Sequence, residues 1–120
     1  MLEEKALQIL EPDLFKVELT GQIARRVKKD LVPKICEEIF QGLVFISTPM
    51  IFNEALSIAL ETGSRASNAF YVAAARLEKA ILISNDRFQI ENAKKSGIEV
   101  YYLLQDEEQL RKRLLEIESL

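Results

Sequence analysis

Histidine is absent from this chain of 120 residues, and Cys36 is its only cysteine. Without histidine there can be no Ser-His-Asp triad, no Cys-His pair and none of the usual zinc sites. A lone cysteine excludes an internal disulfide. Any metal ion would therefore be held by oxygen atoms, which favours Mg²⁺ or Mn²⁺.

Clustered glycines, long apolar runs and an excess of basic charge are also missing. The four glycines are dispersed, so there is no Gly-rich phosphate loop. No apolar run approaches the roughly 18 residues of a membrane span, and Glu3, Glu4 and Lys5 argue against a signal peptide. A net charge of −3 excludes a strongly basic nucleic-acid scaffold but not a local basic patch. We expect a cytoplasmic protein that does not enter membranes.

What the chain does contain fits one folded domain. Hydrophobic residues make up 48% of the sequence and charged residues 29%, which are ordinary proportions for a soluble protein. The length suffices for one compact domain with its own core and is too short for two. No internal repeat, low-complexity tract or linker divides the chain. We therefore expect residues 1–120 to form a single domain.

The hydrophobic pattern predicts helices that alternate with short strands. The expected helices cover residues 1–10, 13–29, 34–41, 51–62, 66–77, 87–96 and 107–118, and the expected strands cover 43–47, 80–83 and 98–104. The 80–83 segment is apolar at every position, as in a parallel strand covered on both faces. The alternation predicts an α/β fold with a parallel sheet, although three strands are few for this length.

Local details follow from the same pattern. Asp13 is expected to cap the helix over 13–29, and Val17 lies in that helix's expected buried stripe. Gly42 and Gly63 are expected to end their helices. The six phenylalanines are expected to anchor the core: Phe15, Phe40, Phe45, Phe52, Phe70 and Phe88. The basic run of residues 25–29 fits the end of a helix, where cations are favourable, better than an RNA contact.

Three polar side chains stand out by their position beside the predicted elements. Glu18 lies in a leucine-rich stretch that follows Pro12. Asn68 lies at the start of a helix, in the motif Asn-Ala-Phe-Tyr. Asp86 follows the strand over 80–83 after the turn residues Ser and Asn. An aspartate after a parallel strand lies at the edge where open α/β sheets bind ligands.

The order of these segments resembles the PIN-domain family of metal-dependent nucleases over roughly residues 4–104. The family has four acidic positions around one or two divalent ions. Glu18 and Asp86 resemble two of them, Asn68 stands where aspartate is usual, and the acid that ends the family's first strand has no counterpart. The resemblance implies a three-layer fold with a short parallel sheet flanked by helices, from which the N-terminal strand is missing.

The resemblance also implies a function, that of the ribonuclease toxins of toxin–antitoxin pairs. Such proteins cleave single-stranded RNA with Mg²⁺ or Mn²⁺, form homodimers and are blocked by a small antitoxin protein. Asp86 and Glu18 would be the catalytic metal ligands, with Asn68 as a weak third ligand. Arg65 and Arg87 flank this site and would bind RNA. A dimer is also expected because a missing strand leaves a sheet edge open.

Each of these residues also has a purely structural explanation. Glu18 could be the solvent-facing flank of a helix, Asn68 a first-turn residue and Asp86 an N-cap. Fewer negative charges hold a cation more weakly, so we expect impaired or degenerate catalysis. The alternative is a non-catalytic PIN-fold module for binding or assembly. A generic α/β domain is the third possibility, and there the three side chains would not converge.

Overall fold

The computed structural model describes residues 7–119 and alternates helices with short strands. In chain order its elements are β1 (Leu10–Pro12), α1 (Leu14–Ala24), the 3-10 helix η1 (Lys29–Leu31), α2 (Val32–Phe40), β2 (Val44–Ile46), α3 (Thr48–Thr62), α4 (Ala66–Glu78), β3 (Leu82–Ser84), α5 (Arg87–Lys95), β4 (Val100–Tyr102) and α6 (Leu103–Glu118). Both strand pairings are parallel. The α/β class expected from the sequence is confirmed.

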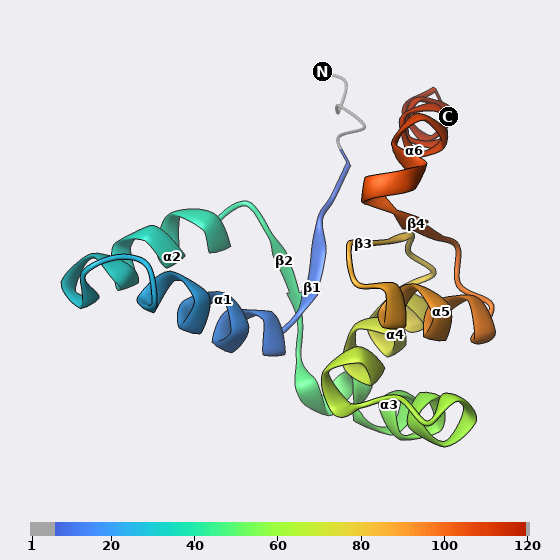
Figure 1. The fold of residues 1–120 in the computed structure, drawn as a ribbon, viewed down its shortest axis with the longest axis horizontal. Coiled ribbons are helices and arrows are strands. Elements are labelled where there is room, and N and C mark those ends of the chain that lie inside the picture. The colour runs from blue at the N-terminus through green and yellow to red at the C-terminus, as the bar shows by residue number, and fades with distance from the viewer. Residues whose placement is uncertain (1–6, 120) are drawn as a thin grey trace.

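The strands form two separate two-stranded sheets rather than one sheet (Figure 1). In the first, Leu10 of β1 lies opposite Val44 of β2; in the second, Leu82 of β3 lies opposite Val100 of β4. Helix α4 contacts both β1 and β3. The expectation of a single short parallel sheet is therefore wrong for the described part of the chain, and one helix supports both sheets.

The segment before Pro12 is the largest departure from the sequence-based expectation. Of the helix expected over residues 1–10, residues 1–6 lie outside the described part, residues 7–9 have no regular structure and Leu10 begins strand β1. Contacts with β2 fix this conformation, since the Val44 N–H donates a 2.9 Å hydrogen bond to the carbonyl of Ile9. Pro12 is compatible with β1 because an edge strand needs no N–H on its unpaired side.

Helices α1 and α2 pack on each other and project as an arm from the rest of the molecule (Figure 1). The arm accounts for a radius of gyration of 15.5 Å, whereas a compact domain of this length has about 13.6 Å. No residue of α1 is buried, and Val17 is 71% exposed, so the expected buried stripe is wrong. Where the arm meets β2, Phe40 packs edge-on against Phe45 with ring centroids 5.5 Å apart.

Helix ends match their expected signals only in part. Gly63 ends α3 in the left-handed conformation, with φ of 70°, as expected. Gly42 does not adopt this conformation. Asp13 occupies the N-cap position of α1 but makes no capping hydrogen bond; it pairs with Lys16 at 3.6 Å instead.

The main core lies where α4 packs against α3 and α5. Its buried side chains are small or β-branched, with Ile58 and Val72 fully buried. The buried face of α3 includes Ile51, Ala55 and Ile58. Phe52 and Phe88 are 48% and 69% exposed, so these two are not core anchors. Ile83 is 44% exposed, so β3 is not covered on both faces as expected.

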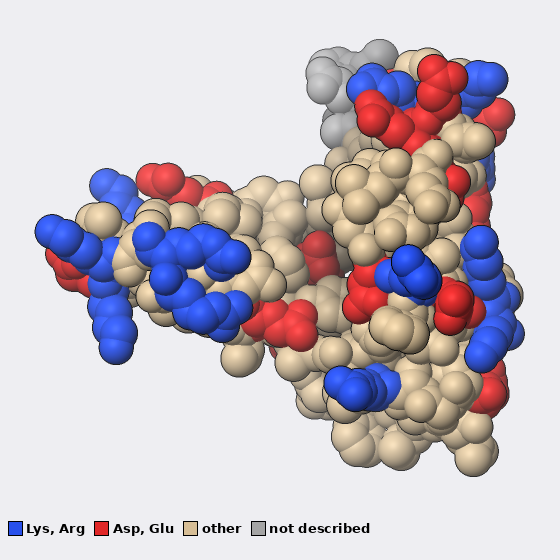
Figure 2. Space-filling model, viewed as in Figure 1, with Lys and Arg blue, Asp and Glu red and all other residues tan. Residues whose placement is uncertain are grey.

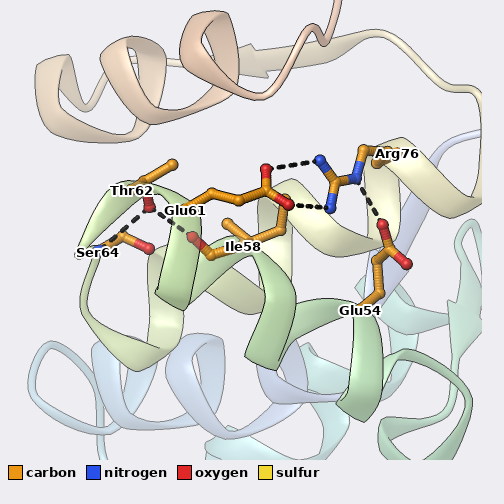
Figure 3. A network of polar contacts seen from close by, with 6 residues as sticks. All are labelled: Glu54, Ile58, Glu61, Thr62, Ser64 and Arg76. Carbon is orange, nitrogen blue, oxygen red and sulfur yellow. Dashed lines mark hydrogen bonds and ion pairs between the residues drawn. The ribbon is translucent and has the colours of Figure 1, made fainter.

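Arg76 adds a polar connection between α4 and α3 (Figure 3). Its two terminal nitrogens donate to the carboxylate of Glu61 at 3.0 and 3.1 Å, and its Nε donates to Glu54. The hydrogen bonds from Arg76 lower the pKa of Glu61. Among the described residues, no helix is long and apolar enough to cross a membrane.

Candidate functional site

Glu18 lies midway along α1, on the side that meets α4. Its Oε1 accepts a 2.6 Å hydrogen bond from the hydroxyl of Tyr71, which α4 carries. Glu18 is half-buried. The side chain therefore does more than face solvent, because it joins the arm to the helix that supports both sheets.

Asp86 caps helix α5. Its Oδ1 accepts hydrogen bonds from the backbone N–H groups of Phe88 at 2.9 Å and Gln89 at 3.3 Å. The backbone N–H of Asp86 itself donates to the Ser84 hydroxyl at 2.9 Å. The N-cap role expected for Asp86 is confirmed, and both capping bonds use the same carboxylate oxygen.

Asn68 lies in the first turn of α4 and meets Asp86 through Gln89. The Gln89 side-chain amide donates to Asn68 Oδ1 at 3.4 Å, while the Gln89 backbone N–H bonds to Asp86. Tyr71 follows Asn68 by three residues, so both lie on one face of α4. The three residues singled out in the sequence thus lie around the start of α4, linked by Tyr71 and Gln89 rather than by direct contact.

Glu11, which the sequence reading did not select, lies beside Glu18. It is half-buried in β1, and burial, followed by the nearby negative charge of Glu18, raises its pKa. Burial and the hydrogen bond to Glu18 also raise the pKa of Tyr71, so this phenol stays protonated as a donor. The sequence did not indicate Glu11 because the strand that carries it was expected to be a helix, and residues 9–12 show no alternation of apolar and polar side chains.

A cavity of about 800 Å³ lies between the two sheets. Residues 7–12 line one side, residues 79–83 line the other, and Tyr71, Ala74 and Ala75 of α4 are also part of its wall. We call this cavity the inter-sheet groove. Glu11, Glu18 and Gln89 also line it. Glu18 follows β1 in the sequence and contacts Tyr71 of α4, while Gln89 follows β3 and contacts Asn68 of α4. The carboxyl ends of β1 and β3 therefore lie at the same end of the groove.

The two arginines expected to contact RNA flank the start of two helices. Arg65 directly precedes α4 and Arg87 is the first residue of α5. Both are exposed. The largest concentration of basic side chains visible in Figure 2 lies elsewhere, over the arm formed by α1 and α2.

The oxygen atoms near the start of α4 are of a type that binds hard cations, but together they carry little negative charge. Carboxylate and amide oxygens are ligands that Mg²⁺ and Mn²⁺ accept. Within residues 7–119, however, no group of three or more acidic or cysteine side chains is placed to hold a metal ion. Glu11 and Glu18 are neighbours, whereas Asp86 is reached from them only through other side chains.

No protein-family model and no curated protein sequence matches this chain.

Proposed function

We propose that this chain is a PIN-like ribonuclease domain with impaired catalysis. One observation carries the proposal: Glu18, Asn68 and Asp86 come from three distant segments, yet they gather around the start of α4 through Tyr71 and Gln89. This is the edge where parallel strands present ligand-binding side chains. A generic α/β domain gives no reason for these residues to share neighbouring partners on α4 and α5.

In this proposal Glu18 and Asp86 are the remaining acids of the metal site, with Asn68 as a neutral third ligand and Glu11 beside Glu18. A bound Mg²⁺ or Mn²⁺ supplies an acidified water and a counter-charge for the phosphate. The residues of the chain hold and orient the bound groups. Catalysis is impaired because Asn68 adds no charge and one oxygen of Asp86 is engaged in capping α5.

Arg65 and Arg87 complete the proposal as contacts for the phosphates of single-stranded RNA. Both are exposed beside the helix starts that carry Asn68 and Asp86. Arginine suits this role because its planar guanidinium pairs with phosphate oxygens through two hydrogen bonds.

Metal binding is the first test. Calorimetric titration of the purified chain with Mn²⁺ should show weak binding, with a Kd on the order of 1 mM, as for sites of low ligand charge. Glu18→Gln should remove this binding, whereas Glu91→Gln, which changes an exposed carboxylate on α5, should leave it unchanged. Absence of Mn²⁺ binding, or equal loss in both variants, would overturn the metal site.

RNA cleavage is the second test, and it asks whether catalysis is impaired. A mixed pool of single-stranded RNA is incubated with Mn²⁺ and either the unaltered chain or Asp86→Asn, which keeps the helix cap. We expect equal, background-level cleavage by both. Cleavage that disappears in Asp86→Asn would mean that the chain is a competent nuclease.

A second candidate function, assembly without catalysis, is favoured by the outer face of α3. Phe52, Leu56 and Leu60 follow one another at intervals of four residues and are 48%, 55% and 88% exposed. An apolar helical stripe of this kind suits a homodimer or an antitoxin-like protein partner. Sedimentation of the chain should show a dimer that Leu56→Lys dissociates, while Leu115→Lys on α6 leaves it intact; a monomer throughout would exclude the homodimer.

A further inference from the structure

The far end of the arm carries most of the arm's basic charge. We call residues 25–34 the arm tip; they run from the end of α1 into the first turn of α2, remote from the two sheets (Figure 1). Half of these ten residues are basic: Arg25, Arg26, Lys28, Lys29 and Lys34. All five side chains are exposed. Asp30 is the only acidic residue of the arm tip, which leaves a formal charge of +4.

Neighbouring side chains do not neutralise the arm tip. None of its five basic residues forms an ion pair within residues 7–119. Arg26 donates instead to the backbone carbonyl of Gln22 at 2.8 Å. The sixth basic residue of the arm, Lys16, lies near its base and pairs with Asp13. Three further carboxylates lie on the arm nearer to the sheets: Glu18, Glu37 and Glu38. The positive charge at the tip is therefore open to an external anion.

Helix stability explains only part of this charge. The helix expected over residues 13–29 would have placed the whole basic run at its C-terminal end, but α1 ends before that run begins. Lys29 is the first residue of η1, and Lys34 lies in the first turn of α2. Cations are favourable at the end of a helix and not at its start. These two lysines therefore do not stabilise the helices that carry them, which indicates a role outside the fold.

The composition of the arm tip favours one class of anionic partner. Proteins that bind single-stranded nucleic acids stack the bases on aromatic side chains, and residues 16–39 contain no Phe, Tyr or Trp. Leu31, between Lys29 and Lys34 in the chain, is 49% exposed. A leucine forms no bond with a phosphate, but beside basic residues it can enter the headgroup region of a lipid bilayer. A lipid surface therefore fits the tip better than RNA does.

The shape of the molecule allows the arm tip alone to meet a flat surface. Helix α1 has 11 residues and is therefore about 16 Å long at 1.5 Å per residue. This exceeds the screening length of about 8 Å at physiological ionic strength. Outside the tip, the described residues carry 16 acidic and ten basic side chains. An anionic surface repels this acidic part, but the length of the arm keeps it far enough away for salt to screen the repulsion.

We propose that the arm tip binds the anionic surface of a lipid bilayer, with its five basic side chains among the lipid headgroups and Leu31 inserted between them. The contact is peripheral, and among the described residues no helix is long and apolar enough to cross the bilayer. The proposal does not depend on ribonuclease activity, because the arm tip contains none of the residues assigned to the metal site.

Vesicle cosedimentation of the full chain tests the electrostatic part of the proposal. The chain should sediment with vesicles made of equal parts of phosphatidylcholine and phosphatidylserine, and remain in solution with phosphatidylcholine alone. In 1 M NaCl it should be released, because the screening length falls to about 3 Å. Lys28→Gln with Lys29→Gln should weaken binding about 25-fold, since each basic residue near such a surface contributes a factor of about five.

A second lysine pair provides the matched control. Lys94 and Lys95 are also adjacent and exposed, but they lie on α5, away from the arm. Lys94→Gln with Lys95→Gln should leave vesicle binding unchanged. Circular dichroism of both double variants checks that they are folded.

Fluorescence tests the insertion of Leu31. The chain contains no tryptophan, so a single introduced indole reports its own surroundings. The emission of Leu31→Trp should move to shorter wavelengths when the phosphatidylserine vesicles are added, because the indole leaves water for the bilayer interface. Leu115→Trp, at a position on α6 that is 63% exposed, should show no such change.

Four outcomes would overturn the proposal. The first is equal binding to both kinds of vesicle, or to neither. The second is equal weakening by the two lysine double variants, which would mean a general attraction rather than a site. The third is cosedimentation without a change in the emission of Leu31→Trp, which would place the contact elsewhere. The fourth is binding of single-stranded or duplex RNA that requires Lys28 and Lys29 in a chain that ignores vesicles, which would assign the arm tip to nucleic acid.

Discussion

The hydroxyl of Tyr71 donates a 2.6 Å hydrogen bond to Oε1 of Glu18, and this contact joins α1 to the helix that supports both sheets. The pKa of Tyr71 is raised by burial and by this bond. The phenol therefore remains a donor throughout the physiological pH range. One oxygen of Glu18 is occupied by the contact, which leaves the other for a cation.

Removal of the Tyr71 hydroxyl should show how much the hydrogen bond to Glu18 stabilises the folded state. Tyr71→Phe is expected to lower the free energy of unfolding by about 1.5 kcal/mol, the scale of a hydrogen bond to a charged group. Urea denaturation provides the measurement. Tyr101→Phe is the matched control, because its hydroxyl bonds to Glu99 in an exposed setting and should matter less. Equal losses of unfolding free energy in the two variants would show that the bond to Glu18 stabilises the fold no more than an exposed hydrogen bond does.

Glu11 should make the protein less stable at neutral pH than at acid pH. Its folded-state pKa is raised above 4.5 by burial and by Glu18. Its favourable contribution is thus present below the unfolded pKa and is lost as pH rises through the folded pKa. At pH 7, Glu11→Gln should be more stable than the unaltered chain by a few tenths to about 1 kcal/mol.

Thermal denaturation at two pH values tests the Glu11 prediction. The advantage of Glu11→Gln should shrink as pH falls through the raised folded-state pKa and be gone below about 4.5, where the carboxyl is neutral in both states. The same substitution at the exposed Glu91 should give no such pH-dependent difference. A destabilised Glu11→Gln at pH 7 would contradict the repulsion from Glu18.

Two substitutions of Asp86 should distinguish its effect on stability from any effect on RNA cleavage. Asp86→Ala removes the acceptor for two backbone N–H groups and should lower the free energy of unfolding by about 0.5–2 kcal/mol. Asp86→Asn should have nearly the same free energy of unfolding as the unaltered chain, since asparagine is also a good N-cap. Chemical denaturation of both variants checks this. A large loss in Asp86→Asn would disqualify it as a control in the cleavage assay.

Arg76 should stabilise the α3–α4 packing in a manner that depends on pH and salt. Arg76→Gln removes the hydrogen bonds to Glu61 and Glu54 and should lower the melting temperature at pH 7. Because the pKa of Glu61 is lowered, its contribution is present above the unfolded pKa and is lost as pH falls through the folded pKa. The variant and the unaltered chain should therefore converge in acid.

High salt provides a further check on Arg76. The difference between the unaltered chain and Arg76→Gln should narrow in 1 M NaCl, because screening weakens charge pairs that reach solvent. Arg111→Gln removes an exposed pair within one helix and should have little effect at any salt concentration. A salt-independent loss in Arg76→Gln would point to packing of its aliphatic stem instead.

Features fixed by neighbouring residues could be predicted from the sequence. The Asp86 cap involves partners two and three residues away, and Gly63 ends α3 through its own left-handed conformation. Helices α3 and α4 are long, and their apolar residues recur at helical spacing. This pattern identifies them as helices even where single residues would also fit another structure. For the same reason, the alternation of helices and parallel strands was predictable.

Features fixed by distant partners could not be predicted. Leu10–Pro12 is a strand because β2, more than thirty residues later, pairs with it; three residues carry too little periodicity to signal this. Glu18 meets Tyr71 across 53 positions, and Glu11 could not be recognised as part of the site until β1 was known. Val17 fits an amphipathic helix, but none of the described elements covers its side of the arm.

Strands β1 and β3 are each paired along one edge only among the described residues, and this has a consequence for the abundance of this protein in a cell. Open edges promote association between chains during synthesis and storage. The lifetime of the chain against aggregation and proteolysis would therefore shorten as its concentration rises.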